Sequence, residues 1–179
     1  TPDTCYMLYV RAECSITDIS DWSQGVTITT PSAPPVCGGI FTDPGGANAN
    51  YANSTDYTVT ICPDAPGDIV TVTFTQFSTE ATWDGLYVYA GDSIASPQIS
   101  SNNPAGNVPG GLPGSFWGTT IPGPFESTPG GCLTFRFRSD NSINAPGWVA
   151  NVTCEPAATC PKPTLVVTSN ITSSNATVA

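Results

Sequence analysis

Apolar and polar residues alternate along much of the chain, beginning with the first 30 residues. Apolar side chains occupy every second position from Tyr6 to Ala12, and a β-branched run covers 26–30. A period of two is typical of a strand with one buried face, so residues 1–30 are predicted to form two strands. Two strands cannot bury a sheet face by themselves. We therefore expect their partners to lie upstream in a longer polypeptide.

Residues 37–154 carry the richest strand pattern and are predicted to form a complete domain. Its strand signals lie at 57–62, 69–77, 86–89, 133–137 and 148–154. Turn sequences rich in Gly, Pro, Asp and Asn separate them, and helical periodicity is missing. We expect an all-β fold, an antiparallel two-sheet β-sandwich.

Two short linkers delimit this domain. The stretch PSAPPV at 31–36 is a stiff, extended connector, and 155–159 forms a second one. Residues 160–179 contain a strand signal around Leu165 and another at 175–179. These residues are predicted to begin another sandwich domain.

Composition and charge exclude several classes of function. The 179 residues include 14 acidic residues, 4 basic residues and no His, for a net charge of −10. Nucleic acids and anionic membranes both require a basic surface, so neither is an expected partner. Without His, a Ser-His-Asp triad and a His-ligated zinc ion are impossible. No apolar run of about 18 residues is present, so membrane insertion is not expected.

Seven cysteines without a C-x-x-C pair indicate an extracellular chain with disulfides. Cys5 and Cys14 lie nine residues apart on one predicted strand, a separation of ~30 Å. A disulfide needs Cα atoms within about 7 Å, so these two are not expected to pair. Cys5 has no evident partner.

The central segment resembles the CUB domain, in the form found in large bacterial surface and secreted proteins. The resemblance rests on CGGIFTDPGG (37–46), YTVTICP (57–63), FSTEATWDGLYVYAGD (77–92), GGCLTFRFRSD (130–140) and GWVANVTC (147–154). These motifs follow one another over essentially the whole segment. The resemblance implies a CUB-like jelly-roll sandwich.

The flanking segments resemble parts of fibronectin type III domains. Tyr6 falls at the position of the tyrosine corner, and SDWSQGVTITT (20–30) resembles the last strand. Residues 160–179 resemble the N-terminal strands of the next such domain. The resemblance implies that Cys14 pairs with a cysteine upstream and Cys160 with one downstream.

The resemblance also implies two disulfides inside the central domain, Cys37–Cys62 and Cys132–Cys154. The second pair flanks the last two predicted strands. Cys132 is out of phase with the inward Leu133, whereas Cys154 is in phase with the inward Trp148. This pairing therefore needs a bulge or frayed strand ends.

Three acidic residues match the calcium ligands of CUB domains. They are Glu80 and Asp84 before the strand at 86–89, and Asp140 after the strand at 133–137. Ca²⁺ prefers 6–8 oxygen ligands, and oxygens near Asn141 and Ser142 are expected to complete the shell. Glu80 lies only four residues before Asp84, a shorter spacing than in animal members of the family. The alternative is three solvated loop acids.

Tryptophans supply further candidates for binding. Trp83 lies beside Asp84 on a loop, and it and Trp117 are possible ligand contacts, although Trp83 could instead cover the edge of the core. Trp22 and Trp148 fit buried strand positions. Ser93, in the sequence Asp-Ser-Ile, resembles a bacterial O-glycosylation site.

We interpret the chain as a non-catalytic extracellular adhesion or ligand-binding region of a large multidomain bacterial protein, stabilised by Ca²⁺. Its expected partners are an extracellular protein or glycan and the neighbouring domains. A carboxylate pair is the minimum for glycoside hydrolysis, but no cleft-forming insertion accompanies these acids. Two alternatives remain, an accessory region of a secreted hydrolase such as a metalloprotease and a pure spacer.

Overall fold

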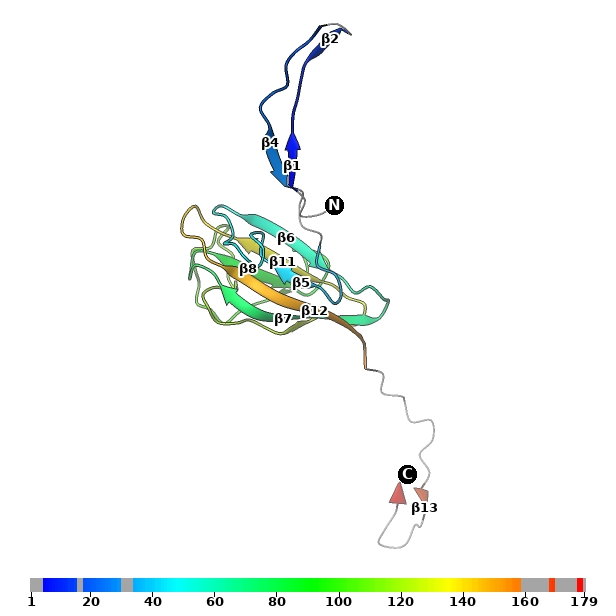
Figure 1. Ribbon diagram of the computed structural model, residues 1–179. Coiled ribbons are helices and arrows are strands. Elements are labelled where there is room, and N and C mark those ends of the chain that lie inside the picture. Colours follow the sequence, from blue (N-terminus) through cyan, green and yellow to red (C-terminus); the bar gives the residue numbers. More distant parts are fainter. Residues whose placement is uncertain (1–4, 16–17, 30–33, 159–167, 170–176, 179) are drawn as a thin grey trace.

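The computed structural model describes residues 5–15, 18–29, 34–158, 168–169 and 177–178, and these contain strands and loops but no helix. Accordingly, the described residues include no helix that could span a membrane. Most of the described residues form a β-sandwich between positions 34 and 158, with a hairpin preceding it and two short strands following it (Figure 1).

Two four-stranded antiparallel sheets form the sandwich, which confirms the predicted fold class. The first sheet has the order β10-β7-β12-β5, and the second has the order β6-β11-β8-β9. The strands of the first sheet are β5 (Ile40–Thr42), β7 (Asp68–Ser78), β10 (Phe125–Glu126) and β12 (Gly147–Pro156). Those of the second are β6 (Asp56–Ile61), β8 (Gly85–Tyr89), β9 (Gln98–Ile99) and β11 (Leu133–Arg138). The five strong strand signals correspond to β6, β7, β8, β11 and β12.

Aromatic side chains from both sheets fill the space between them. Phe74 of β7 packs edge-to-face on Phe125 of β10, and Phe135 of β11 lies 4.9 Å from Phe41 between ring centroids. Trp148 is buried against Phe41 and Phe137, which confirms its predicted core position. Burying each such side chain contributes roughly 1.5–3 kcal/mol.

Strand β8 is buried on both faces, unlike the half-buried strand that a simple alternation predicts. Leu86 and Val88 face the main core, whereas Tyr87 and Tyr89 belong to a second apolar cluster with Val108 and Trp117. The Gly- and Pro-rich segment 101–131 supplies both Val108 and Trp117, and Leu86 forms a bridge with Phe116. The part of the segment from Val108 to Trp117 therefore covers the face of β8 that carries Tyr87 and Tyr89, whereas Phe125 belongs to β10 of the first sheet.

The disulfides are Cys37–Cys154 and Cys62–Cys132, so the predicted pairs Cys37–Cys62 and Cys132–Cys154 are wrong. The reason is that β11 and β12, although consecutive, belong to different sheets. Cys62 directly follows Ile61, the last residue of β6. Cys132 directly precedes Leu133, the first residue of β11, and Ile61 and Leu133 are paired. Cys37 lies beside β12, where the Gly38 N–H donates to the Val152 carbonyl. Each disulfide therefore joins neighbouring strands within one sheet.

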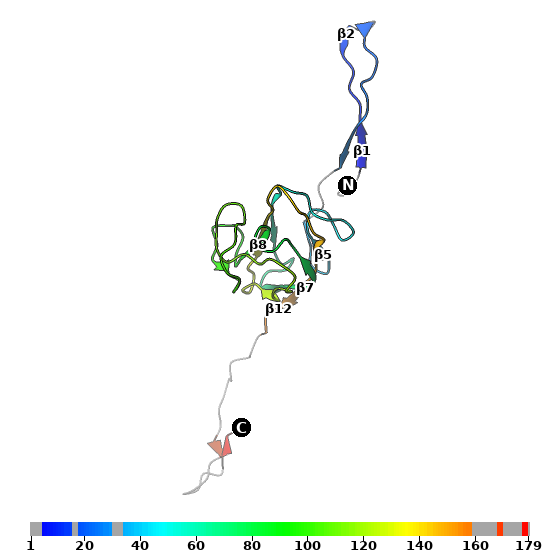
Figure 2. The same cartoon turned by 90° about the vertical axis from the view of Figure 1, so that its left-hand side faces the viewer.

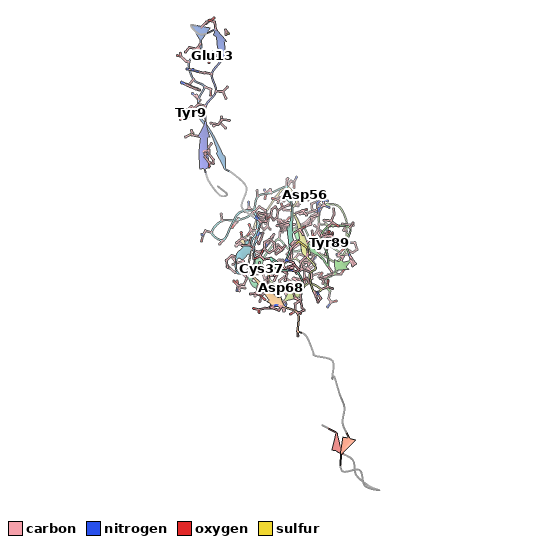
Figure 3. All side chains as sticks on the ribbon, turned by 90° about the vertical axis from the view of Figure 1, so that its right-hand side faces the viewer. Tyr9, Glu13, Cys37, Asp56, Asp68 and Tyr89 are labelled. Atoms are coloured by element: carbon pink, nitrogen blue, oxygen red, sulfur yellow. A yellow bond between two sulfur atoms is a disulfide. The ribbon has the colours of Figure 1, made fainter. Side chains whose placement is uncertain are left out.

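The N-terminal hairpin is separate from the sandwich sheets (Figures 1 and 2). It pairs β1 (Cys5–Leu8) with β4 (Val26–Thr29), and β2 (Glu13–Ser15) with β3 (Asp18–Ile19). Its large apolar side chains are exposed, and labelled Tyr9 and Glu13 project from it in Figure 3. Trp22 is 60% exposed, so its predicted core position is wrong. It lies in a loop beneath the Arg11 guanidinium, 4.8 Å from the ring centroid.

Some predictions for the flanking segments stay untested. Cys14 is exposed and has no disulfide partner among the described residues. The short strands β13 (Thr168–Ser169) and β14 (Thr177–Val178) pair antiparallel. Cys160 and the rest of 159–167 and 170–176 lie outside the described residues, so the fibronectin type III assignment stays a prediction.

The disulfide pattern leads to a direct test. Peptide mapping under non-reducing conditions is expected to recover Cys37–Cys154 and Cys62–Cys132. Replacing both cysteines of either pair by Ala should lower the free energy of unfolding by ~2–5 kcal/mol, measured by urea denaturation, because each bridge constrains the unfolded chain. Recovery of a Cys37–Cys62 peptide would contradict the sheet assignment.

Candidate metal centre

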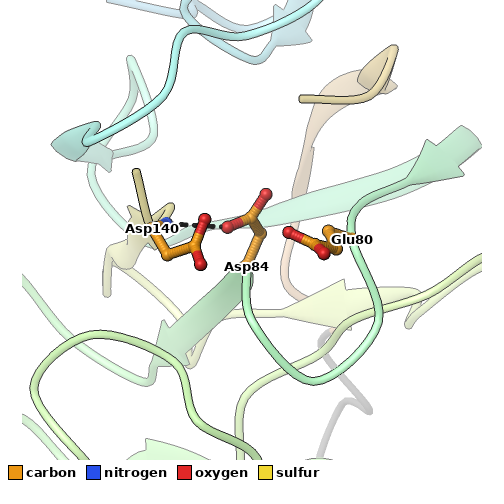
Figure 4. Close-up of side chains that lie close together, drawn as sticks. All are labelled: Glu80, Asp84 and Asp140. Carbon is orange, nitrogen blue, oxygen red and sulfur yellow. Dashed lines mark hydrogen bonds between the residues drawn. The ribbon is translucent and has the colours of Figure 1, made fainter. Parts of the chain in front are cut away.

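Three carboxylates converge at one end of the sandwich, as Figure 4 shows. Glu80 and Asp84 lie in the turn between β7 and β8, and Asp140 lies two residues after β11 ends. Strands β8 and β11 are antiparallel neighbours whose register pairs Gly85 with Arg138. The residues just beyond this pair therefore meet, and the Asp140 N–H donates to Asp84 Oδ1 over 2.8 Å.

The three side chains present their oxygens to one small volume. One carboxylate oxygen from each residue lies within 4.8 Å of the other two. Asp84 is fully buried, whereas Glu80 and Asp140 are partly exposed. A cation at this point could contact all three carboxylates at once.

Tyr51 orients the cluster and was missed by the sequence analysis. Its hydroxyl donates to Asp84 Oδ2 over 2.6 Å and accepts the Glu80 N–H over 3.0 Å. The ring is fully buried and packs edge-to-face on Phe137. Tyr51 lies in a loop without a strand pattern, 33 residues before Asp84, so no local signal connected the two residues.

The electrostatic environment of the cluster is unfavourable for negative charge. Burial raises the pKa of Asp84, although the Tyr51 hydroxyl and the Asp140 N–H partly oppose this increase. Burial, followed by the charges of Asp84 and Asp140, raises the pKa of Glu80. Glu80 Oε2 is buried without a hydrogen-bond partner among the described residues. No Lys or Arg in the described part of the chain forms a salt bridge with any of the three.

The loop after β11 holds Asp140 in place. Asp140 Oδ1 accepts the Ser142 N–H over 2.9 Å and lies 3.5 Å from the Ser142 hydroxyl. The Asn141 carbonyl accepts from the Asn53 side chain over 3.3 Å, and Asn50 donates to the Asn144 side-chain oxygen over 2.9 Å. Asn141 and Ser142 are thus close to the cluster, and their predicted role as ligands stays a prediction.

No protein-family model matches the chain. Among solved structures, the full extracellular region of zebrafish Gpr126/Adgrg6 is similar over 70% of this chain and 15% of that one, with 24% sequence identity and a TM-score of 0.51. The CUB2 domain of MASP-1 bound to Ca²⁺ is similar over 68% of this chain and 98% of that domain, with 25% identity and a TM-score of 0.47. The likeness to the receptor region shows the fold alone, and the chain corresponds to a small part of that region.

The remaining predicted site residues are not members of the carboxylate cluster. Trp83 is 43% exposed on the β7–β8 turn, so it does not cover the core. Trp117 is partly buried and packs on Tyr87 and Tyr89. Ser93 is exposed in the turn after β8, with its hydroxyl 3.5 Å from that of Ser96. Exposure makes Ser93 accessible, and its glycosylation stays a prediction.

The raised pKa of Glu80 predicts how the metal-free protein responds to pH. Between the ordinary Glu pKa of 4.5 and the raised value, the folded state binds more protons than the unfolded state. The free energy of unfolding therefore falls as pH rises through this window. In chelator at pH 7, Glu80→Gln should therefore have a higher Tm than wild type, by a small amount because the side chain is partly exposed, and the difference should vanish toward pH 4.

Thermal unfolding at several pH values, always with chelator, measures this difference. Asp64→Asn, in the exposed turn between β6 and β7, is the matched control and should leave the pH dependence unchanged. A Glu80→Gln variant less stable than wild type at pH 7 in chelator would show that the Glu80 charge is compensated within the protein.

Proposed function

We propose that residues 37–154 form a CUB domain that binds one Ca²⁺ ion through Glu80, Asp84 and Asp140 and serves as a non-catalytic extracellular ligand-binding module. The observation that carries the proposal is the convergence of these three carboxylates around a buried Asp84, without a salt-bridge partner among the described residues. The Cys37–Cys154 disulfide supports the proposed bounds, because it joins the first and last residues of the domain. Two disulfides also favour an oxidising, extracellular location.

The donor set suits calcium better than a softer metal. All three side chains offer carboxylate oxygens, and no His or free Cys lies in the cluster. Asp84 already accepts hydrogen bonds at both oxygens, and each oxygen retains a lone pair for an ion. Backbone carbonyls of the loop after β11 and water molecules would supply further ligands. One Ca²⁺ ion would balance two of the three negative charges.

The remaining negative charge suggests how a protein ligand is recognised. Once the ion orients the carboxylates, a Lys or Arg side chain of a partner can form a charge-assisted hydrogen bond with them. Trp83, next to Asp84 and 43% exposed, offers an adjacent ring for contact with the same partner. Binding of this kind should weaken with salt.

Catalysis by these residues is not part of the proposal. Asp84 is fully buried and the chain contains no His, so a substrate could not reach the central carboxylate and no imidazole could assist. We propose that fibronectin type III domains flank the module in a bacterial surface or secreted protein. An HExxH motif elsewhere in the full protein would instead favour an accessory region of a metalloprotease, and absence of any ligand would favour a spacer.

Calcium binding is tested by calorimetry and thermal unfolding of the 179-residue chain. At a free calcium concentration 100 times Kd, wild type should gain about 2.7 kcal/mol, which corresponds to roughly 10 °C in Tm. Asp140→Asn keeps an acceptor for the Ser142 N–H but removes a charge, so it should lose both the calorimetric signal and the Tm increase.

Asp64→Asn again provides the control, because it removes an equal charge away from the cluster and should retain calcium binding. Equal melting curves for wild type with calcium and with chelator, together with no heat of binding, would leave the three residues as solvated loop acids.

A further inference from the structure

A polar hollow of about 350 Å³ adjoins the metal centre through Asp140, which belongs to both. The rest of its wall comes from the start of β6, the end of β11 and the loops beside them, and includes Ser54, Asp56, Pro109, Arg138 and Asn141. Small ligands occupy cavities of about 300–1,000 Å³. The hollow therefore has room for a polar group the size of one side chain.

Arg138 supplies the observation that points to a ligand. Its guanidinium carries five N–H donors but forms no hydrogen bond with any described residue. Its Nε is sealed from solvent, whereas the two terminal nitrogens reach it. Nη2 lies 3.6 Å from Asp56 Oδ2, which is too far for a hydrogen bond. The wall of the hollow thus contains a cation whose terminal donors are unused.

Asp56 does not satisfy Arg138 because it is already paired with another arginine. Arg136 donates to both oxygens of Asp56 over 2.9 and 2.8 Å, which is a bidentate pair. These hydrogen bonds lower the pKa of Asp56. Two arginines thus share one carboxylate, and Arg138 has the longer contact with it.

The surroundings of Arg138 provide space and further donors. Gly110 leaves room for the guanidinium, because a Cβ at that position would lie 2.5 Å from Nη1. The Ser54 hydroxyl and the Asn141 amide also belong to the wall, and neither side chain forms a hydrogen bond within the described part of the protein. Both groups can donate to the oxygens of a ligand. The donors of the hollow therefore suit an anion with more than one oxygen.

The charge at the edge of the hollow depends on the metal centre. Without an ion, the carboxylate of Asp140 repels an approaching anion. A Ca²⁺ ion shared by Glu80, Asp84 and Asp140 would offset that repulsion, because it places two positive charges beside the hollow. An anion should therefore bind more tightly to the calcium-loaded protein.

We propose that this hollow binds the carboxylate of an Asp or Glu side chain of a protein partner, with Arg138 as its principal donor. A carboxylate matches the planar guanidinium, because paired N–H groups can bind its two oxygens together. The inference deepens the proposed ligand-binding role and rests on it, since the same partner presents a Lys or Arg side chain to the metal centre. The partner surface is thus one on which a basic and an acidic side chain lie close together.

Charge complementarity favours a protein partner over an acidic glycan. A polymer of uronic acids carries only negative charges, and it would meet the three carboxylates of a chain with a net charge of −10. A protein segment can carry both signs of charge, so that each side chain meets its opposite. The glycan is the alternative occupant that the experiment must exclude.

The test is a titration of the 179-residue chain with the α-amide of N-acetylglutamate, whose side-chain carboxylate is its only charge. It is carried out at constant ionic strength, with calcium and with chelator, and is followed by NMR of the arginine Nε–H groups. The Arg138 signal should shift, whereas the corresponding glutamine compound, which has the same shape and no charge, should leave it in place. Affinity should be about fivefold higher with calcium than with chelator, at the lower end of typical coupling between two sites.

Variants of Arg138 separate charge from geometry. Arg138→Gln should weaken the affinity for the glutamate compound at least tenfold, the effect of losing hydrogen bonds to a charged group. Arg138→Lys keeps the charge but loses the planar fork, so its affinity should lie between those of wild type and Arg138→Gln. Arg11→Gln removes an equal charge from the N-terminal hairpin and is the matched control, with wild-type affinity expected. Shifts of the Gly110 backbone N–H measure the affinity in every variant.

The proposal is overturned if the glutamate compound does not shift the Arg138 signal of the calcium-loaded chain, or if Arg138→Gln binds it as tightly as Arg11→Gln does. Methyl glucuronide binding more tightly than the glutamate compound would overturn it in favour of an acidic glycan. Calorimetry with calcium separates the two sites. A heat of calcium binding without carboxylate binding would refute the hollow and leave the metal centre standing, whereas carboxylate binding without a calcium signal would support the hollow and refute the metal centre.

Discussion

The burial of Asp84 is the constraint on which this end of the sandwich depends. A carboxylate without solvent contact must have its oxygens paired, and here the Tyr51 hydroxyl and the Asp140 N–H provide the partners. These two contacts join the loop before β6, the β7–β8 turn and the loop after β11. The Asp84 backbone adds a third connection, because its carbonyl accepts the Thr79 hydroxyl. One buried acid thus organises three segments distant in sequence.

The same arrangement leaves three neighbouring carboxylates without a salt-bridge partner among the described residues. Only four Lys and Arg residues are present in the chain, and Arg136 and Arg138 both lie near Asp56 on another part of the second sheet. The hydrogen bonds from Arg136 lower the pKa of Asp56, whereas burial raises the pKa of Glu80 and Asp84. Acids in one fold thus have opposite environments. The three acids that converge have no salt-bridge partner among the described residues, and a divalent cation is the simplest compensation.

Sequence patterns predicted those features that depend on local periodicity or on motif resemblance. The long strands β6, β7, β11 and β12 follow from alternation, and the resemblance brought Glu80, Asp84 and Asp140 together before any geometry was known. Features that depend on which sheet a strand joins could not be predicted locally. The phase difference between Cys132 and Cys154 was a sign that they do not face each other, because β11 and β12 lie in different sheets. Tyr51 and the covering residues Val108 and Trp117 act through long-range contacts that leave no periodic signal.

The covering segment, Val108 to Trp117, adds a second apolar cluster to a domain with two conventional sheets. Its placement requires close approach to β8, and Gly85 permits this, because a Cβ at that position would lie 2.7 Å from the Ser115 Cβ. Tyr87 and Tyr89 are buried beneath it, where they pack with Val108 and Trp117. Because Gly85 directly follows Asp84, the residue that admits the covering layer and the residue that organises the carboxylates are adjacent. The β7–β8 turn therefore holds together the carboxylate cluster and the layer that covers β8.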